Sequence, residues 1–220
     1  MIPLPDTVRI FPLAEVVLFP DTLLPLHIFE PRYRKMLADS MDSDRTIGMT
    51  LIRTPESSGD AAGPEAPDVY PVGCAGRIVK HDALPDGRSV IVLRGTVKFR
   101  IRTEVYPGEP YRVVEAQALH EPPVPAELMR EWRDELRVRL VEYVDAVAGD
   151  NDKVEKLFHK LELEGLMNYL CASLPLDAVE KQSLLECATA EQRFKRLCEI
   201  VGFKAAEARL GLDATRDADA

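Results

Sequence analysis

Three prolines within four positions, Pro122, Pro123 and Pro125, divide the sequence into halves whose apolar residues follow different periods. Proline lacks a backbone N–H and its ring fixes φ, so neither a helix nor a central strand runs through such a segment. Before it, apolar residues alternate with polar ones or form short β-branched runs, whereas after it they recur every three or four positions. The sequence therefore predicts an α+β protein with a β subdomain at residues 1–120 and a helical subdomain at residues 121–220.

The first half contains short extended segments bounded by proline, glycine and acidic residues, a pattern typical of small sheets. We expect strands at residues 7–13, 16–19, 22–28, 46–53, 72–81, 89–93, 97–101 and 111–119. Glu30-Pro31 places a proline at a first helical position and starts one short helix among the strands. Residues 54–68 hold no large apolar side chain and predict a mobile loop. Six or more short strands with one inserted helix favour a closed or nearly closed barrel.

In the second half, an apolar stripe from Leu128 to Val147 predicts a long amphipathic helix that ends near Gly149. The same spacing predicts further helices at residues 154–161, 166–174, 178–187 and 190–210. Asp177 followed by Glu180 is a capping-box pattern, which marks one of these helix starts. The polar tail at residues 213–220 is expected to fray.

The charge balance argues against several protein classes. The chain has 28 Lys and Arg and 37 Asp and Glu, which gives a formal net charge of −9. A chain with this negative charge is not expected to be a general nucleic-acid binder. Residues 10–29, the most apolar stretch near the start, are broken by prolines and predict no membrane span. The first six residues lack the basic and apolar regions of a secretory signal. Four cysteines without a C-x-x-C pair favour reduced, buried thiols. We therefore expect a cytoplasmic protein.

The sequence contains none of the common catalytic motifs: no G-x-x-x-x-G-K-[ST] or G-x-G-x-x-G loop, no G-x-S-x-G elbow and no H-E-x-x-H zinc site. Glu155, His159 and Glu162 would share a helix face, but interleaved lysines favour a solvated charged face over a metal site. His27 and Cys74 are the candidate base and nucleophile of an undescribed hydrolase, although packing is the commoner role of such residues. We expect no enzyme activity, no cofactor and no metal.

A basic row of Lys98, Arg100 and Arg102 alternates with apolar residues in one expected strand. Alternate strand residues project in one direction about 7 Å apart, so this row is the best candidate for an anion-binding surface. The competing interpretation is that these charges keep a strand from pairing with other chains. No stacking aromatic residue shares the face of the row, which weighs against RNA binding.

Several segments together carry a family resemblance. They are IFPL at 10–13, VVLFP at 16–20, LPLHIFE at 24–30, RYR at 32–34, ML at 36–37, GCAGRI at 73–78, LPDGR at 84–88, LRG at 93–95, LPL at 174–176 and EKQSLLE at 180–186. In order and spacing they resemble the N-terminal, substrate-binding domain of Lon-type ATP-dependent proteases, which also occurs as a free-standing protein. The resemblance extends to about Gly202. It implies a PUA-like β pseudo-barrel with one inserted helix, followed by a helical bundle. The family often has arginine where Lys98 stands, and a lysine would weaken any bidentate contact there.

The resemblance implies a recognition module rather than an enzyme, because the ATPase and the Ser-Lys peptidase of Lon proteases lie on later domains. The implied partners are unfolded or degron-bearing polypeptides, or a protease or ATPase partner. An apolar contact with a basic rim is expected where the barrel meets its helix, at Leu23, Phe29, Arg32, Tyr33, Arg34 and Met36. Core packing is the alternative role for this stripe. RNA binding by a PUA-like barrel is the second functional hypothesis, and a dimer contact would equally use unpaired apolar surface.

Overall fold

The computed structural model describes residues 4–53, 68–105, 108–147 and 149–218, with side chains described up to Leu210. The chain divides into two compact units, one of residues 1–120 with 171–186 and one of residues 121–170 with 187–220. The loop predicted at residues 54–68 lies, apart from Asp68, outside the described residues.

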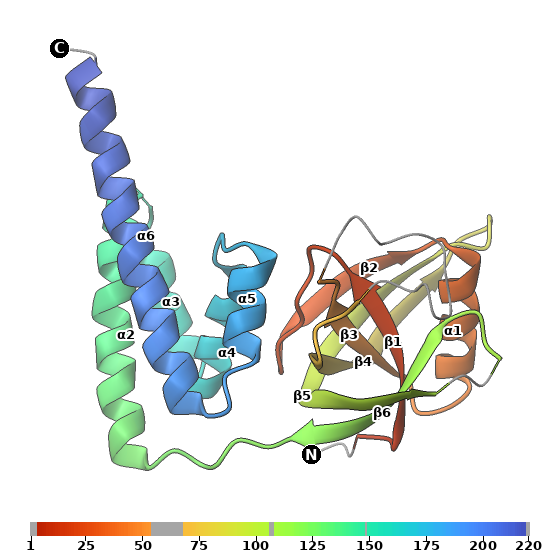
Figure 1. The fold of residues 1–220 in the computed structure, drawn as a ribbon. Helices are drawn as coiled ribbons and strands as arrows, with labels where there is room; N and C mark the ends of the chain where they lie inside the picture. Colours follow the sequence, from red (N-terminus) through yellow and green to blue (C-terminus); the bar gives the residue numbers. More distant parts are fainter. Residues whose placement is uncertain (1–3, 54–67, 106–107, 148, 219–220) are drawn as a thin grey trace. The chain divides into compact units, whose positions relative to one another are not determined.

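The first unit is built on a six-stranded mixed sheet (Figure 1). Its strands are β1 Thr7–Leu13, β2 Leu23–Ile28, β3 Thr46–Leu51, β4 Val72–Ala83, β5 Ser89–Val105 and β6 Arg112–Leu119. Hydrogen-bonded pairs link β5, β4, β3, β1 and β6 in that order, and β6 returns to β5, so five strands form a closed ring. The strand β2 pairs with the first half of β5, whereas β6 pairs with the second half. Among the described residues β2 pairs with β5 alone, which makes it an edge strand.

Apolar side chains from four strands of the ring pack together in its interior. They form a cluster of Val8, Ile10, Ala75, Val97, Phe99 and Val114. Their burial contributes about 25 cal/mol per Å² of apolar surface. The alternation predicted for residues 97–101 identifies Val97 and Phe99 as inward-facing, whereas all six residues of β3 are buried.

The predicted strand at residues 16–19 is wrong. These residues have no strand partner in the structure, although Leu18 and Phe19 are buried. The chain turns directly after Phe19, whose carbonyl accepts a hydrogen bond from the Thr22 hydroxyl at 2.7 Å. The two strands predicted at residues 89–93 and 97–101 are one continuous strand, β5.

The inserted helix α1, Pro31–Met41, begins with proline at the expected first position. Its buried stripe consists of Tyr33, Met36, Leu37 and Ser40. The Tyr33 ring packs on Phe11 of β1, with the ring centroids 4.1 Å apart. This packing fixes α1 against the sheet immediately after β2.

The later helices are α2 Ala126–Ala146, α3 Asn151–Lys160, α4 Leu163–Ser173, α5 Ala178–Leu185 and α6 Ala190–Ala218. In the second unit α2 and α6 lie side by side (Figure 1), and Trp132 stacks on Phe194 with ring centroids 4.8 Å apart. Arg193 is buried and donates to the Glu121 carboxylate at 2.5 Å. The helix α6 continues to Ala218, so residues 213–218 of the polar tail are helical, beyond the predicted helix end at residue 210. No helix within the described residues combines the length and the apolar character that crossing a membrane requires.

The subdomain predicted at residues 121–220 needs a correction, because residues 171–186 group with the first unit. The buried Gln182 of α5 donates from Nε2 to the Val72 carbonyl of β4 at 2.9 Å. This long-range hydrogen bond ties α5 to the sheet. Helical periodicity identifies the helix but carries no information on this partner.

Candidate functional site

The strand β2 turns one face to the core and the other to solvent. Leu26 and Ile28 are buried, whereas the alternate residues are exposed. Leu23 at the start of the strand is 64% exposed, and Phe29 directly after its end is 60% exposed. Two large apolar side chains on one solvent-facing edge strand are the feature that most needs a functional explanation.

Cross-strand register extends this apolar surface over β5 and β4. Pro25 pairs with Val92, which pairs with Lys80, and residues directly opposite one another share a face of the sheet. Val92 and its neighbour Val90 are half-buried, and Val79, in a bulge of β4, is exposed. We call the resulting surface the outer face. Its apolar residues are Leu23, Pro25, Phe29, Val79, Val90 and Val92.

A tight turn fixes the Leu23 end of the outer face. Asp21 has a φ of 60°, and its N–H donates to the Gly95 carbonyl at 2.9 Å, while the Gly95 N–H donates to the Thr22 carbonyl at 2.9 Å. A Cβ at Gly95 would collide with the carbonyl oxygen of Phe19, so this close approach requires glycine. The turn clamps the chain before β2 onto β5 and thereby sets the position of Leu23.

The start of α1 fixes the Phe29 end. Glu30 is the N-cap residue, so Phe29 occupies N′ and Arg34 occupies N4. An apolar N4 side chain normally packs on an apolar N′ side chain. Here the N4 side chain is a guanidinium, and it lies against Gly87, where an added Cβ would displace it. Phe29 therefore stays exposed because its usual packing partner is replaced by a charge.

The structure places the predicted contact residues on two different sides. Tyr33 is 6% exposed and Met36 is 0% exposed, so both are core residues and the prediction of an exposed contact is corrected for them. Arg32 makes an ion pair with Glu30 at 2.9 Å, and its guanidinium lies 4.6 Å from the Tyr33 ring centroid. Leu23, Phe29 and Arg34 remain on the exposed side. The stripe on α1 packs inward because the sheet covers it.

The predicted basic row is not a continuous surface. Lys98 is only 4% exposed, whereas Arg100 and Arg102 are exposed. Lys98 sits in the ladder between Cys74 and Leu119. Arg102 donates to the Gln117 side chain. Burial of Lys98 leaves only two exposed charges in the row, so the prediction of three aligned surface charges is corrected.

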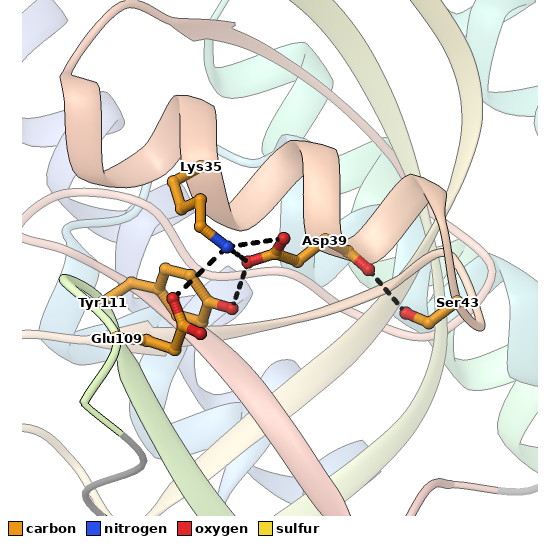
Figure 2. Close-up of polar contacts among 5 residues, drawn as sticks. All are labelled: Lys35, Asp39, Ser43, Glu109 and Tyr111. Carbon is orange, nitrogen blue, oxygen red and sulfur yellow. Dashed lines mark hydrogen bonds and ion pairs between the residues drawn. The ribbon is translucent and has the colours of Figure 1, made fainter.

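A polar cluster anchors α1 to the segment before β6 (Figure 2). The Lys35 ammonium lies 2.6 Å from a carboxylate oxygen of Asp39 and 3.4 Å from one of Glu109, and the Tyr111 hydroxyl donates to Asp39 at 2.6 Å. The hydrogen bond from Lys35, followed by that from Tyr111, lowers the pKa of Asp39 below its usual value. Burial, followed by the hydrogen bond to Asp39, raises the pKa of Tyr111. The Ser43 hydroxyl donates to the Asp39 carbonyl at 2.8 Å. These ion pairs and hydrogen bonds fix α1 against the segment that precedes β6.

The candidate catalytic groups are not brought together. Burial raises the pKa of the Cys74 thiol to about 12, which leaves it protonated at neutral pH. His27 is exposed on β2, so it is not the buried base considered from the sequence. Glu155 is bound by the Arg137 guanidinium. This arrangement gives Cys74 no activation as a nucleophile.

Sequence reasoning missed part of the outer face. Val90 and Val92 alternate with buried residues of the predicted hairpin, and this signal marks an outward-facing pair. Their position beside Leu23 and Phe29 depends on the pairing of β2 with β5, which joins segments about 65 residues apart in the chain and leaves no local pattern.

Comparison with known proteins identifies the family. The model of the ATP-dependent protease La (LON) substrate-binding domain matches residues 7–202. "Lon protease 2" of Syntrophobacter fumaroxidans is 28% identical over 183 residues, which cover 83% of this chain and 22% of that protein. "Lon protease" of Parabacteroides distasonis is 26% identical over 200 residues, covering 89% of this chain and 24% of that protein. The chain thus spans less than a quarter of the length of these relatives.

Two solved structures share the fold. A Lon N-terminal domain protein from Xanthomonas campestris has a TM-score of 0.57 and 22% identity, covering 87% of this chain and 96% of that one. The N-terminal domain of a Mycobacterium avium complex Lon protease has a TM-score of 0.63 and 16% identity, covering 89% and 97%. The match of the family model over most of the chain shows that this protein belongs to the family of the ATP-dependent protease La (LON) substrate-binding domain.

Proposed function

We propose that this protein is a non-enzymatic recognition module that binds unfolded or degron-bearing polypeptides through the outer face. The observation that carries the proposal is the exposure of Leu23 and Phe29 at the two ends of β2, with Val90 and Val92 between them on β5. Contiguous exposed apolar surface marks interaction sites in soluble proteins. The family match to a substrate-binding domain supports a polypeptide as the ligand.

The expected affinity is modest. At about 25 cal/mol per Å² of apolar surface, complete covering of the exposed part of Phe29 contributes about 2–4 kcal/mol and that of Leu23 about 1–2 kcal/mol. Association costs offset part of this gain. Such a surface binds exposed apolar segments weakly and reversibly. It does not bind a folded protein, because that protein buries its apolar segments in its own core.

Recognition of a backbone edge is the less favourable mode. An added strand would pair with β2, but Pro25 lies in the middle of that edge strand and has no N–H to donate. Side-chain contact with the outer face is therefore the mode that we propose, rather than strand addition.

The pairing circuit of the strands supports a PUA-like pseudo-barrel. RNA binding, the known use of such barrels elsewhere, has little support here. Burial of Lys98 breaks the basic row, and the net charge of −9 opposes binding of a polyanion. The outer face could also bind a protease partner or a second copy of the chain, and an experiment must distinguish these ligands from an unfolded polypeptide.

A fluorescence-anisotropy titration tests the proposal. The purified protein is titrated into a labelled, permanently unfolded polypeptide and, in parallel, into single-stranded RNA, each at low and moderate salt. We expect saturable binding to the polypeptide and none to the RNA. Binding of RNA that weakens steeply with salt would favour the RNA hypothesis. If neither ligand binds at high micromolar protein, the outer face does not recognise unfolded chains.

A further inference from the structure

We propose that the outer face selects polypeptide segments whose apolar centre carries an acidic residue on each side. This inference rests on the proposed function and adds to it a preference for charge. The chain as a whole is acidic, with a net charge of −9, so an uncompensated positive charge beside an apolar surface is a local feature that the overall composition does not suggest.

Ion pairing around the outer face leaves two guanidinium groups uncompensated. Four acidic groups at its border each have a basic partner. The pairs are Arg32–Glu30 at 2.9 Å, Lys80–Asp82 at 2.8 Å, Arg88–Asp86 at 2.6 Å and Arg94–Asp21 at 3.2 Å. Arg34 and Arg77 are exposed, and their side chains make no ion pair or hydrogen bond with any residue that the structure describes.

Arg34 lies at the Phe29 end. It occupies N4 of α1 and Phe29 occupies N′, positions that neighbour each other at a helix start. The first turn of α1 contains no acidic residue, and the carboxylate of the N-cap residue Glu30 makes no cap hydrogen bond but pairs with Arg32, so the backbone N–H groups of the helix start donate to no side-chain cap that the structure describes. Both features favour a carboxylate beside Phe29.

Arg77 lies at the Leu23 end. In the sheet register Leu23 pairs with Arg94, and Arg94 pairs with Arg77. Residues directly opposite share a face, and neighbouring strands are about 4.8 Å apart, so Arg77 projects from the same face about 10 Å from Leu23. Since Arg94 is engaged by Asp21, Arg77 carries the free charge of this end.

The distance between the two ends sets the length of the preferred segment. Phe29 follows Leu23 by six positions of extended chain, which span about 20 Å. An extended ligand along β2 covers that distance with about six residues. The expected ligand therefore has acidic residues about six or seven positions apart with apolar residues between them.

Peptide binding with matched sequences tests this inference. Three labelled peptides share one apolar centre of five residues and differ only in their flanks, which are glutamate, glutamine or lysine on both sides. A fourth has glutamates separated by two central residues. We expect the glutamate-flanked peptide to bind about five- to tenfold more tightly than the glutamine peptide, and the lysine peptide to bind most weakly.

Protein variants assign the effect. Arg34→Gln and Arg77→Gln should each lower the ratio of the affinities for the glutamate and glutamine peptides, and the double variant should bring this ratio close to one. Arg100→Gln is the matched control, because Arg100 is exposed on β5 and makes no ion pair among the described residues. Folding of each variant is checked by its thermal transition.

The outcomes separate the two proposals. If all flanks bind equally and Phe29→Ala weakens each of them, the outer face recognises polypeptides but the charge preference is refuted. If no peptide binds, the proposed function fails together with this inference. A preference for glutamate that persists in both arginine variants, or that disappears equally in Arg100→Gln, would also overturn the assignment.

Discussion

Replacing Phe29 with alanine removes the largest exposed apolar side chain of the outer face. An aromatic side chain presents about 150–250 Å² in total. Phe29 is 60% exposed, so about 90–150 Å² remains for a ligand to cover. At about 25 cal/mol per Å² this area corresponds to ~2–4 kcal/mol. A ligand that covers half of it loses about 1–2 kcal/mol in the variant, which weakens binding about 5- to 30-fold.

The assay is the anisotropy titration with unfolded polypeptide, with the free energy of unfolding measured in parallel by urea denaturation. Because most of Phe29 is already in solvent, stability should change by less than about 1 kcal/mol. Phe203→Ala is the matched control, since Phe203 is 66% exposed but lies on α6 in the second unit. Equal affinities for the wild type and Phe29→Ala, or a larger loss in Phe203→Ala, would refute the assignment of the outer face.

Three further variants test how the fold supports this surface. Tyr111→Phe removes a hydrogen bond to the Asp39 carboxylate, so the pKa of Asp39 should rise toward its usual value in an NMR titration. The variant should lose about 1 kcal/mol of stability at pH 7, a difference that shrinks as the pH falls through the depressed pKa of Asp39. Gly95→Ala places a methyl group on the carbonyl of Phe19 and should cost about 1–3 kcal/mol in urea denaturation. Met36→Ala should lower the free energy of unfolding by about 2–5 kcal/mol, while the folded protein binds polypeptide with unchanged affinity. Weaker binding by the folded variant without this loss of stability would show that Met36 contacts the ligand.

Local patterns predicted most of the elements because their causes are local. Proline at the first position of α1 and the prolines that delimit the strand at residues 22–28 act through neighbouring residues only. Leu23 and Phe29, predicted at an apolar contact with core packing as the alternative, are exposed in the structure. The segment at residues 16–19 has the composition of a strand but pairs with no strand that the structure describes, and directly after it Asp21 and Thr22 hydrogen-bond to Gly95.

The unpredicted parts of the candidate site depend on contacts between distant segments. Lys98 is buried although it alternates with Val97 and Phe99 of the core cluster, so a strand pattern alone gives no indication that its own face is covered. Tyr33 and Met36 are core residues because the sheet covers this face of α1. Helical periodicity identifies the apolar stripe but does not indicate whether another element covers it. Residues 171–186 likewise group with the sheet, to which Gln182 of α5 donates a long-range hydrogen bond, and no local pattern indicates this partner. Sequence periodicity identifies the apolar face of a helix or strand. Contacts between distant segments determine whether that face is buried.

The most direct test of the central claim is to locate the ligand on the protein. Backbone amide chemical shifts are recorded with and without a saturating, permanently unfolded polypeptide. We predict that the perturbed amides cluster at residues 23–29, 77–80 and 90–94, which form the outer face. Saturable binding with perturbations confined to α2 and α6, or spread evenly over the chain, would contradict the proposal that the outer face is the recognition surface.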